Sequence, residues 1–392
     1  MSRASPHIYI RITMNLSTIN RLLKRYPTKW IAFAVFLWLI LLFKYCGFFT
    51  YFFTRDYFSE FTYPLEGDIP KCVSQLRSGQ NPDIKPLTTA NYSFIRFNKT
   101  KCLDSSMTKK KKINLLILVK SALHHRGNRG AIRRSWGQET AIANVEIRIL
   151  FLLGISASHN DHKFDDLITN EHEKYGDILQ SDFVDAYFNN TIKTMQGIRW
   201  VIENCDNAEF ILFSDDDMYV SIKNLLKFIR NPFYYPKEIE DSSKLNVVPK
   251  ALYAGSVFLV SPVRTQFSKW YISVDEYPFS HYPPFVNAGS FVLSYEALVQ
   301  LFYGSMFTKY FRFDDVFLGL IAKKMKIDPI HSDYFYNWKK AYSKIGYKDI
   351  IAVHGYDNPI SLTRIWNEQD NKRNKLHFEV FNFQEYLCTK ED

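Results

Sequence analysis

The 392-residue sequence has no Gly-rich phosphate loop, no internal repeat and no Gly-x-Ser-x-Gly motif. Absence of the last motif counts against an α/β serine hydrolase. The five cysteines form no Cys-x-x-Cys pair, so a structural zinc site of the common spacing is not expected. Ten basic residues, as many as the net charge of +10, lie in two clusters, 1–29 and 109–112, and neither cluster is interleaved with aromatic residues in the manner of a nucleic-acid groove. The sequence therefore does not predict a nucleic-acid partner.

Acidic residues are missing from positions 1–29, which carry six arginines and lysines. An apolar segment, 30–53, follows; Lys44 interrupts it, and it is long enough to cross a bilayer. Because basic flanks remain on the cytosolic side, we expect 1–29 in the cytosol and the rest of the chain across the membrane. A cleaved signal peptide fits less well, since no small-x-small site follows. No other run approaches spanning length, which predicts a single-pass type II membrane protein.

Residues 54–112 are polar, contain four prolines and show little periodicity. This composition predicts a stem with little fixed structure, followed by a lumenal domain at 113–392. Disulfides are permitted on the lumenal side. Four cysteines lie there and allow three pairings, among which the sequence does not choose: Cys72, Cys102, Cys205 and Cys388. Three Asn-x-Ser/Thr sequons lie on the same side: Asn91, Asn98 and Asn189.

Apolar runs alternate with amphipathic segments from Ile113 onward. We expect strands at 113–119, 145–153, 178–183, 210–213, 251–260 and 285–293. We expect helices at 129–136, 164–175, 192–205, 295–303 and 315–325. Alternation of strands with helices predicts an α/β fold, a mostly parallel sheet covered by helices on both faces.

Three consecutive aspartates, Asp215, Asp216 and Asp217, end the apolar run 210–213. Ligands of such sheets bind at the carboxyl ends of the strands. A hard divalent cation, with phosphate oxygens as further ligands, would relieve the repulsion among three carboxylates. The alternative is a solvated loop or helix cap before 221–230. A calcium EF-hand is excluded, because its sixth and twelfth positions are not Gly and Glu.

A second acidic pair, Asp314 and Asp315, stands at the start of the expected helix 315–325. Carboxylates at a helix N-terminus are favourable for electrostatic reasons alone, so a capping role is one interpretation. The functional alternative is a general base, which would take a proton from an attacking hydroxyl group.

Six motifs occur in one order along the chain: AIRRSWG (131–137), FLLG (151–154), DFVDAYFNNTIKT (182–194), FSDDDMYV (213–220), KWYISVDEYPFSHYPPFVNAGSFVLS (269–294) and FDDVFLG (313–319). Together they resemble the inverting β1,3-galactosyltransferase and β1,3-N-acetylglucosaminyltransferase family over roughly residues 113–325. The resemblance implies a GT-A fold that binds a UDP-sugar and Mn²⁺ in the Golgi lumen.

The acidic motif carries the metal in this resemblance. Asp215 and Asp217 would form the metal and diphosphate site, with Asp217 the direct ligand and Asp216 beside the diphosphate. His354 resembles a late histidine that completes the metal shell. Neutral imidazole suits Mn²⁺, although a single loop histidine is more often structural.

Other matches concern the nucleotide, the base and the acceptor. Arg129, Arg133 and Lys193 would help to hold the nucleotide or its loop. The alternative is a surface salt bridge for the two arginines and a solvated helix charge for Lys193. Asp315 matches the catalytic base. The acceptor region departs from the family pattern at Phe285 and at 290–291, which leaves the acceptor's shape open. Of three tryptophans weighed as sugar platforms, we expect Trp136 and Trp200 in the core, and Trp270 stays a candidate.

These features predict an inverting glycosyltransferase that makes a β1,3 linkage, and among the family's activities we expect a β1,3-galactosyltransferase. The donor would be a UDP-sugar, and the acceptor a glycan on a glycoprotein or glycolipid. The rival from another class is a catalytically silent lumenal carbohydrate-binding or chaperone module on the same fold. A metal-dependent phosphohydrolase is disfavoured by the motif order. The sequence leaves the donor sugar open, and also whether the chain is a homodimer.

Overall fold

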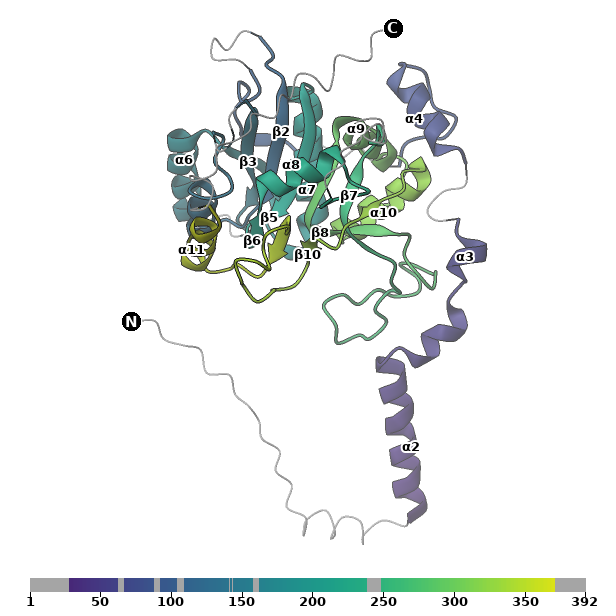
Figure 1. Cartoon of the computed structure of the whole chain (residues 1–392). Helices are drawn as coiled ribbons and strands as arrows, with labels where there is room; N and C mark the ends of the chain where they lie inside the picture. The colour runs from purple at the N-terminus through teal and green to yellow at the C-terminus, as the bar shows by residue number, and fades with distance from the viewer. Residues whose placement is uncertain are drawn as a thin grey trace, which may run out of the picture. The chain divides into compact units, whose positions relative to one another are not determined.

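The computed structural model describes residues 28–62, 67–87, 92–103, 109–140, 142, 144–157, 162–237 and 248–370 (Figure 1). The predicted cytosolic tail up to residue 27, the sequon at Asn91 and Cys388 lie outside these residues. The chain divides into two compact units. Unit 1 combines the chain up to Phe61 with Ser261–His281, and unit 2 contains Thr62–Val260 and the chain from Tyr282 onward.

Unit 2 is built on an eight-stranded sheet with the strand order β1-β4-β3-β2-β5-β8-β7-β9. Its strands are β1 (Phe94–Arg96), β2 (Ile113–Lys120), β3 (Ile147–Ile155), β4 (Ile178–Val184), β5 (Ala208–Asp215), β7 (Tyr253–Phe258), β8 (Phe285–Ser294) and β9 (Ile330–His331). The four strands β4, β3, β2 and β5 run parallel, whereas β8 is antiparallel to both β5 and β7. The predicted α/β fold is confirmed, with a mixed sheet.

Helices cover both faces of this sheet because alternate strand residues point to opposite sides. The helices of unit 2 are α4 (Ile69–Arg77), α5 (Arg126–Arg133), α6 (His162–Tyr175), α7 (Asn190–Asn204), α8 (Ile222–Arg230), α9 (Tyr295–Ser305), α10 (Asp314–Met325) and α11 (Pro359–Asp370). Of these, α4 packs on α9 and α10, and α11 packs on α5. In β2, Leu115 and Ile117 join a core cluster that includes Ile132 of α5. On the other face, Leu118 lies against Gly197 of α7, where a Cβ would come within 3.3 Å of it.

A second sheet of three short strands adjoins the aspartates in the chain. It contains β10 (Phe335–Tyr336), β11 (Ala352–His354) and β6 (Met218–Val220). Strands β11 and β6 are antiparallel, with His354 opposite Met218. This pairing brings a residue from the late part of the chain beside the Asp217–Met218 peptide.

The predicted stem contains more structure than expected. Helix α4 buries Ile69, Cys72 and Val73, and its N-terminus is capped by the Asp68 carboxylate. Strand β1 pairs with β4 and so belongs to the main sheet. The expectation of little fixed structure is therefore wrong for these segments, because their apolar side chains have a core to pack into. A disulfide joins Cys102 to Cys205, and Cys72 is a buried free thiol.

Unit 1 contains the predicted membrane segment. Helix α2 (Thr28–Tyr45) is followed by a 3₁₀ helix, η1 (Phe48–Phe53), and by α3 (Tyr57–Glu60). Among the described residues, α2 is the one helix long and apolar enough to cross a membrane. It ends earlier than the predicted 30–53 segment because Gly47 adopts a left-handed conformation with φ of 80°.

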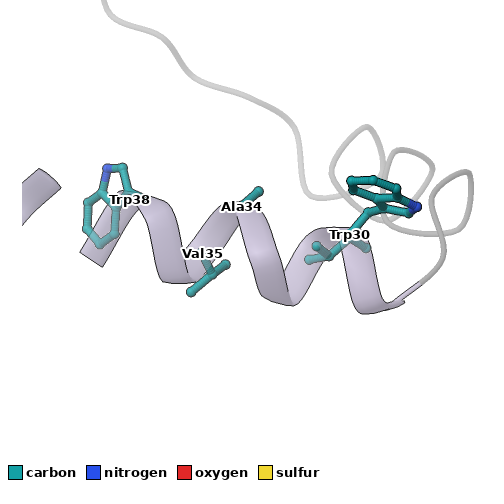
Figure 2. Close-up of a pocket in the computed structure, with 5 residues that line it drawn as sticks. Trp30, Ala34, Val35 and Trp38 are labelled. Atoms are coloured by element: carbon teal, nitrogen blue, oxygen red, sulfur yellow. The ribbon is translucent and has the colours of Figure 1, made fainter. Parts of the chain in front are cut away.

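A shallow apolar hollow runs along α2 itself. Figure 2 shows Trp30, Ala34, Val35 and Trp38 around it, all from this one helix. None of the helix residues is buried. A recess formed by a single exposed apolar helix is a surface that lipid chains would cover, and it contains none of the predicted site residues.

Candidate active site

The carboxyl ends of β2 and β5 place a lysine opposite the first aspartate. Lys120 and Asp215 are register partners at the ends of these parallel strands. The Lys120 Nζ lies 3.1 Å from Asp215 Oδ1 and 2.9 Å from Asp314 Oδ2, and it donates to the Ala288 carbonyl at 3.0 Å. With 3% of its side chain exposed, this ammonium group has three acceptors for its three protons. Lys120 thus joins the two acidic motifs.

The charges of this cluster depend on one another. Burial alone would lower the pKa of Lys120, but the carboxylates of Asp215 and Asp314 raise it above its ordinary value. Burial raises the pKa of Asp215 to about 6, although Lys120 opposes the shift. Sequence reasoning missed Lys120. The available signal in the sequence was a single cation, Lys120, at the end of a largely apolar and otherwise uncharged run, 113–120.

The two carboxylates at the start of α10, Asp314 and Asp315, differ in their partners and in the direction of their pKa shifts. Asp314 is buried and accepts from Lys120 and, at 2.8 Å, from the Thr194 hydroxyl of α7. Burial would raise the pKa of Asp314, but Lys120 holds it below its ordinary value. Asp315 accepts the Val316 amide at 2.8 Å. Its pKa is raised by burial and by the neighbouring Asp314 charge. Asp315 is therefore the member of the pair suited to gain and release a proton.

A carboxylate and an imidazole meet where β6 and β11 pair. Asp217 Oδ2 lies 3.0 Å from His354 Nε2. The other oxygen of Asp217, Oδ1, is buried without a hydrogen-bond partner in the described structure. The hydrogen bond to Asp217 raises the pKa of His354. The two residues predicted to share a metal are thus adjacent.

These donors fit a divalent cation. An orphaned carboxylate oxygen and an imidazole nitrogen are both suitable ligands for Mn²⁺. Within the described ranges, no group of three His, Cys, Asp or Glu side chains forms a complete site. Further ligands would come from diphosphate oxygens and water, as is usual for cations that bind nucleotides. The Asp215 carboxylate, predicted as a ligand, is engaged by Lys120 instead.

Asp216 has partners within the protein. Its Oδ2 accepts from the Ser121 hydroxyl at 2.6 Å and lies 2.9 Å from His125 Nδ1, while its backbone carbonyl accepts from the Asn128 amide. The same bond to Asp216 raises the pKa of His125. The Asp216 carboxylate therefore ties the end of β5 to the β2–α5 loop, 121–125.

Arg129 is fully buried and also organises this loop. Its guanidinium makes two hydrogen bonds to Glu171 of α6, at 2.9 and 2.7 Å. It also donates to the Ser121 hydroxyl at 3.1 Å and to the Ala122 carbonyl at 2.6 Å. All of these partners are internal, so the side chain acts on the shape of the loop.

Arg133 and Lys193 have internal partners as well. Arg133 is bidentate with Asp177 at 2.7 Å for both bonds and reaches Glu171 at 2.7 Å. Lys193 is buried and donates to the Ser121 carbonyl at 2.6 Å and to Asp185 at 2.8 Å. Lys193 is therefore not the solvated helix charge of the simpler interpretation, whereas Arg133 does form ion pairs, which are largely buried.

Aromatic side chains follow the seam between α7 and the loop before α10. The Tyr310 hydroxyl donates to the Phe188 carbonyl at 3.2 Å, and the Thr191 hydroxyl to the Phe311 carbonyl at 2.8 Å. Tyr187, Phe188 and Tyr310 remain exposed. Trp136 and Trp200 are buried, as predicted. An exposed aromatic edge therefore leads to the Asp314–Asp315 pair.

Comparisons with known proteins show the family of the chain. A family model described as galactosyltransferase matches residues 127–333. "Beta-1,3-galactosyltransferase brn" of Drosophila melanogaster is 39% identical over 331 residues, which are 84% of this chain and 93% of that protein. "Beta-1,3-galactosyltransferase 1" of Homo sapiens is 31% identical over 290 residues, 74% of this chain and 82% of that protein.

Solved structures resemble the chain more distantly. The galactosyltransferase LgtC, in complex with donor and acceptor sugar analogues, has 12% identity and a TM-score of 0.34, covering 67% of this chain and 100% of that chain. Mouse xyloside xylosyltransferase 1 has 14% identity and a TM-score of 0.27, covering 62% and 97%.

The mixed α/β sheet, the acidic clusters at its edge and the relatives define a glycosyltransferase. The chain belongs to the galactosyltransferase family and is a hexosyltransferase. The resemblance drawn from the six sequence motifs is confirmed.

Proposed function

We propose that the chain transfers galactose from UDP-galactose to a sugar hydroxyl of a glycan acceptor, forming a β1,3 linkage with inversion. The names of the relatives support the galactosyl donor and the linkage. The observation that carries the chemistry is Asp315, a carboxylate whose pKa is raised by burial and by Asp314, next to an exposed aromatic edge. A single displacement at the anomeric carbon inverts its configuration. This displacement needs one general base, which takes the proton of the acceptor hydroxyl.

The reaction assigned to these residues is a single in-line substitution. The acceptor oxygen forms a bond to the anomeric carbon of the donor as the bond from that carbon to the UDP oxygen breaks. The proton of the acceptor hydroxyl passes to Asp315. Asp217 and His354 would hold Mn²⁺, which when bound supplies Lewis-acid stabilisation of the diphosphate. Asp215 stays beside Lys120 at the adjacent strand end.

Arg129, Arg133, Lys193 and Asp216 are proposed to act by positioning. The structural support is that three of them converge on the 121–125 loop, which they hold between β5, α6 and α7. A rigid loop at the end of β2 would keep backbone amides directed at the nucleotide without reorganisation during the reaction.

The cellular setting is also proposed. We propose residues 1–29 as the cytosolic tail, 30–53 as the signal-anchor region with α2 as its helical part, and 113–392 as the catalytic domain in the Golgi lumen. Residues 54–112 would be the stem, whose α4 and β1 pack onto the catalytic fold. One apolar N-terminal helix is consistent with a type II anchor. Asn98 and Asn189 are the described sequons available for N-glycosylation there.

The test is a donor panel with the full chain solubilised in detergent. UDP-galactose, UDP-N-acetylglucosamine and UDP-N-acetylgalactosamine are each supplied with Mn²⁺ and galactose-, glucose- or mannose-terminated acceptors, and Asp315→Asn is the matched control. Galactose transfer with a β1,3 linkage, absent in the control, is expected. Use of N-acetylglucosamine alone would overturn the donor, and no transfer from any donor would overturn the function.

A further inference from the structure

The segment between β7 and β8 in the chain, Ser261–His281, belongs to the same unit as the juxtamembrane residues. We call this segment the interface loop. At its start, the Gln266 amide donates to the carbonyl of Tyr45, the last residue of α2, at 3.1 Å. At its end, the Arg55 amide donates to the Pro278 carbonyl at 2.8 Å. The loop is therefore bonded at both ends to the chain that leaves the membrane helix.

Arg264 gives the interface loop a fixed shape. Its guanidinium donates to four backbone carbonyls of the loop, at 2.9, 2.8, 2.7 and 3.2 Å: Ile272, Ser273, Tyr277 and Phe279. One guanidinium group therefore holds the backbone at 272–273 close to the backbone at 277–279. Because this bonding fixes the backbone, side chains at the tip are presented to their surroundings at little further cost in conformational entropy.

Gly47 is the point of closest approach between the loop and the end of α2. Its φ is +80°, and a Cβ at this position would lie 2.6 Å from the Arg264 carbonyl oxygen and 2.7 Å from the Arg264 Cβ. Both the left-handed turn and the contact require the absence of a side chain. An alanine at position 47 would therefore push the loop away from the helix end.

The tip of the interface loop exposes large aromatic side chains. Phe267 is 77% exposed and Trp270 is 51% exposed. The Phe267 ring lies 5.7 Å from the ring of Tyr45, so the exposed surface of the loop continues into that of α2. The Lys269 ammonium lies 4.7 Å from the Trp270 ring centre. Apolar rings beside an ammonium group form the amphipathic pattern of residues at a membrane–water boundary.

We propose that the interface loop is a second membrane contact, which places Phe267 and Trp270 in the headgroup region of the lumenal leaflet. The occupant is the bilayer itself, because the exposed surface is continuous with a helix that has no buried residue. Exposed apolar patches of this kind mark interaction sites. The inference rests on α2 being the membrane anchor, as proposed above, and not on the catalytic assignment.

The experiment reconstitutes the full chain in phosphatidylcholine nanodiscs that contain a phospholipid with a photoreactive diazirine near the glycerol backbone. After illumination, lipid adducts are mapped by mass spectrometry. We expect adducts on 264–271 as well as on α2. Labelling of α2 without the loop would overturn the proposal.

Two matched variants sharpen this result. Gly47→Ala should lose the adducts on the loop and keep those on α2, because it disrupts the loop contact beside the helix end. Unchanged labelling of the loop in Gly47→Ala would contradict the idea that the contact between Gly47 and Arg264 holds the loop at the membrane. Asp315→Asn should label like the parent chain, since the contact does not depend on catalysis. If the parent chain is active but its interface loop carries no lipid adducts, the membrane contact is refuted and the proposed function is not. If the loop carries adducts but the chain transfers no sugar, the proposed function is refuted and the membrane contact is not.

Discussion

Neighbouring carboxylates acquire different properties from their partners. Asp314 is held ionised by Lys120, while Asp315, one residue later, receives a backbone amide and the repulsion of Asp314. The same division occurs in the triplet, where Asp216 has internal donors and Asp217 retains a buried oxygen without a hydrogen-bond partner in the described residues. In each motif, one carboxylate supports the structure and another is left for chemistry.

Replacing Asp315 by asparagine separates chemistry from binding. The amide is nearly isosteric and can still accept the Val316 amide, so α10 should keep its N-terminus. It cannot take up the acceptor's proton, and we expect the transfer rate to fall by about two orders of magnitude or more. Affinity for the UDP-sugar should change little. Transfer rate and donor affinity are measured side by side, and near-normal transfer in Asp315→Asn would remove this residue from the base role.

The pH profile provides an independent test of the same residue. Burial and Asp314 raise the pKa of Asp315 to about 7, and a general base must be deprotonated. Transfer should therefore fall about tenfold per pH unit below 7 and level off above it. Saturating Mn²⁺ and donor are needed, because His354 also has a raised pKa. An identical acidic limb in the residual activity of Asp315→Asn would contradict the assignment.

The same pKa has a consequence for stability. A carboxyl group with a raised folded-state pKa binds its proton more tightly in the folded than in the unfolded chain. Its contribution to the free energy of unfolding is full below the unfolded pKa and is lost as the pH rises through about 7.

At the scale of elements, α5 and α6 are joined by buried charges. Arg129 and Glu171 are both fully buried, and Arg133 adds a third hydrogen bond to Glu171. A buried ion pair contributes little over an apolar pair, but removal of one partner leaves an uncompensated charge. The pair therefore specifies how α5, and with it the 121–125 loop, lies against α6.

Arg129→Met should lower the free energy of unfolding by about 3–5 kcal/mol. Arg134→Met is the matched control; it should cost little, because Arg134 is exposed and the bonds between Arg129 and Glu171 stay in place. The double variant Arg129→Met, Glu171→Leu should recover part of the loss. Denaturant unfolding of the full chain in detergent measures all three. If Arg129→Met unfolds like the parent yet fails to bind UDP-galactose, the arginine is a nucleotide contact and not a structural one.

Element types were predictable, but pairings between distant elements were not. The apolar runs 113–119 and 210–213 predicted β2 and β5, and the acidic residues after the second run predicted the site. Asp216 and Asp217 follow β5 in the turn before β6, so strand periodicity does not set the directions of their side chains. The register of Lys120 with Asp215 depends on strand order, which local patterns do not encode.

The same limit applies to the whole molecule. The sequence left the disulfide open among three pairings, and the fold joins Cys102 to Cys205 across a separation of 103 residues. The stem was expected to be irregular from its prolines, yet β1 completes the edge of the main sheet. The second half of the interface loop, 269–281, lies within a family motif, but the bonds of the loop to the end of α2 depend on long-range folding.

The orientation of the whole chain is the last prediction. Six cations and no acidic residue precede the apolar segment, so the N-terminus should stay in the cytosol and residues 54–392 should be lumenal. The Cys102–Cys205 disulfide agrees with an oxidising compartment. Protease added to sealed microsomes should remove an N-terminal tag and spare a C-terminal one until detergent is added. Digestion of the C-terminal tag in intact vesicles would reverse the topology and exclude a lumenal enzyme.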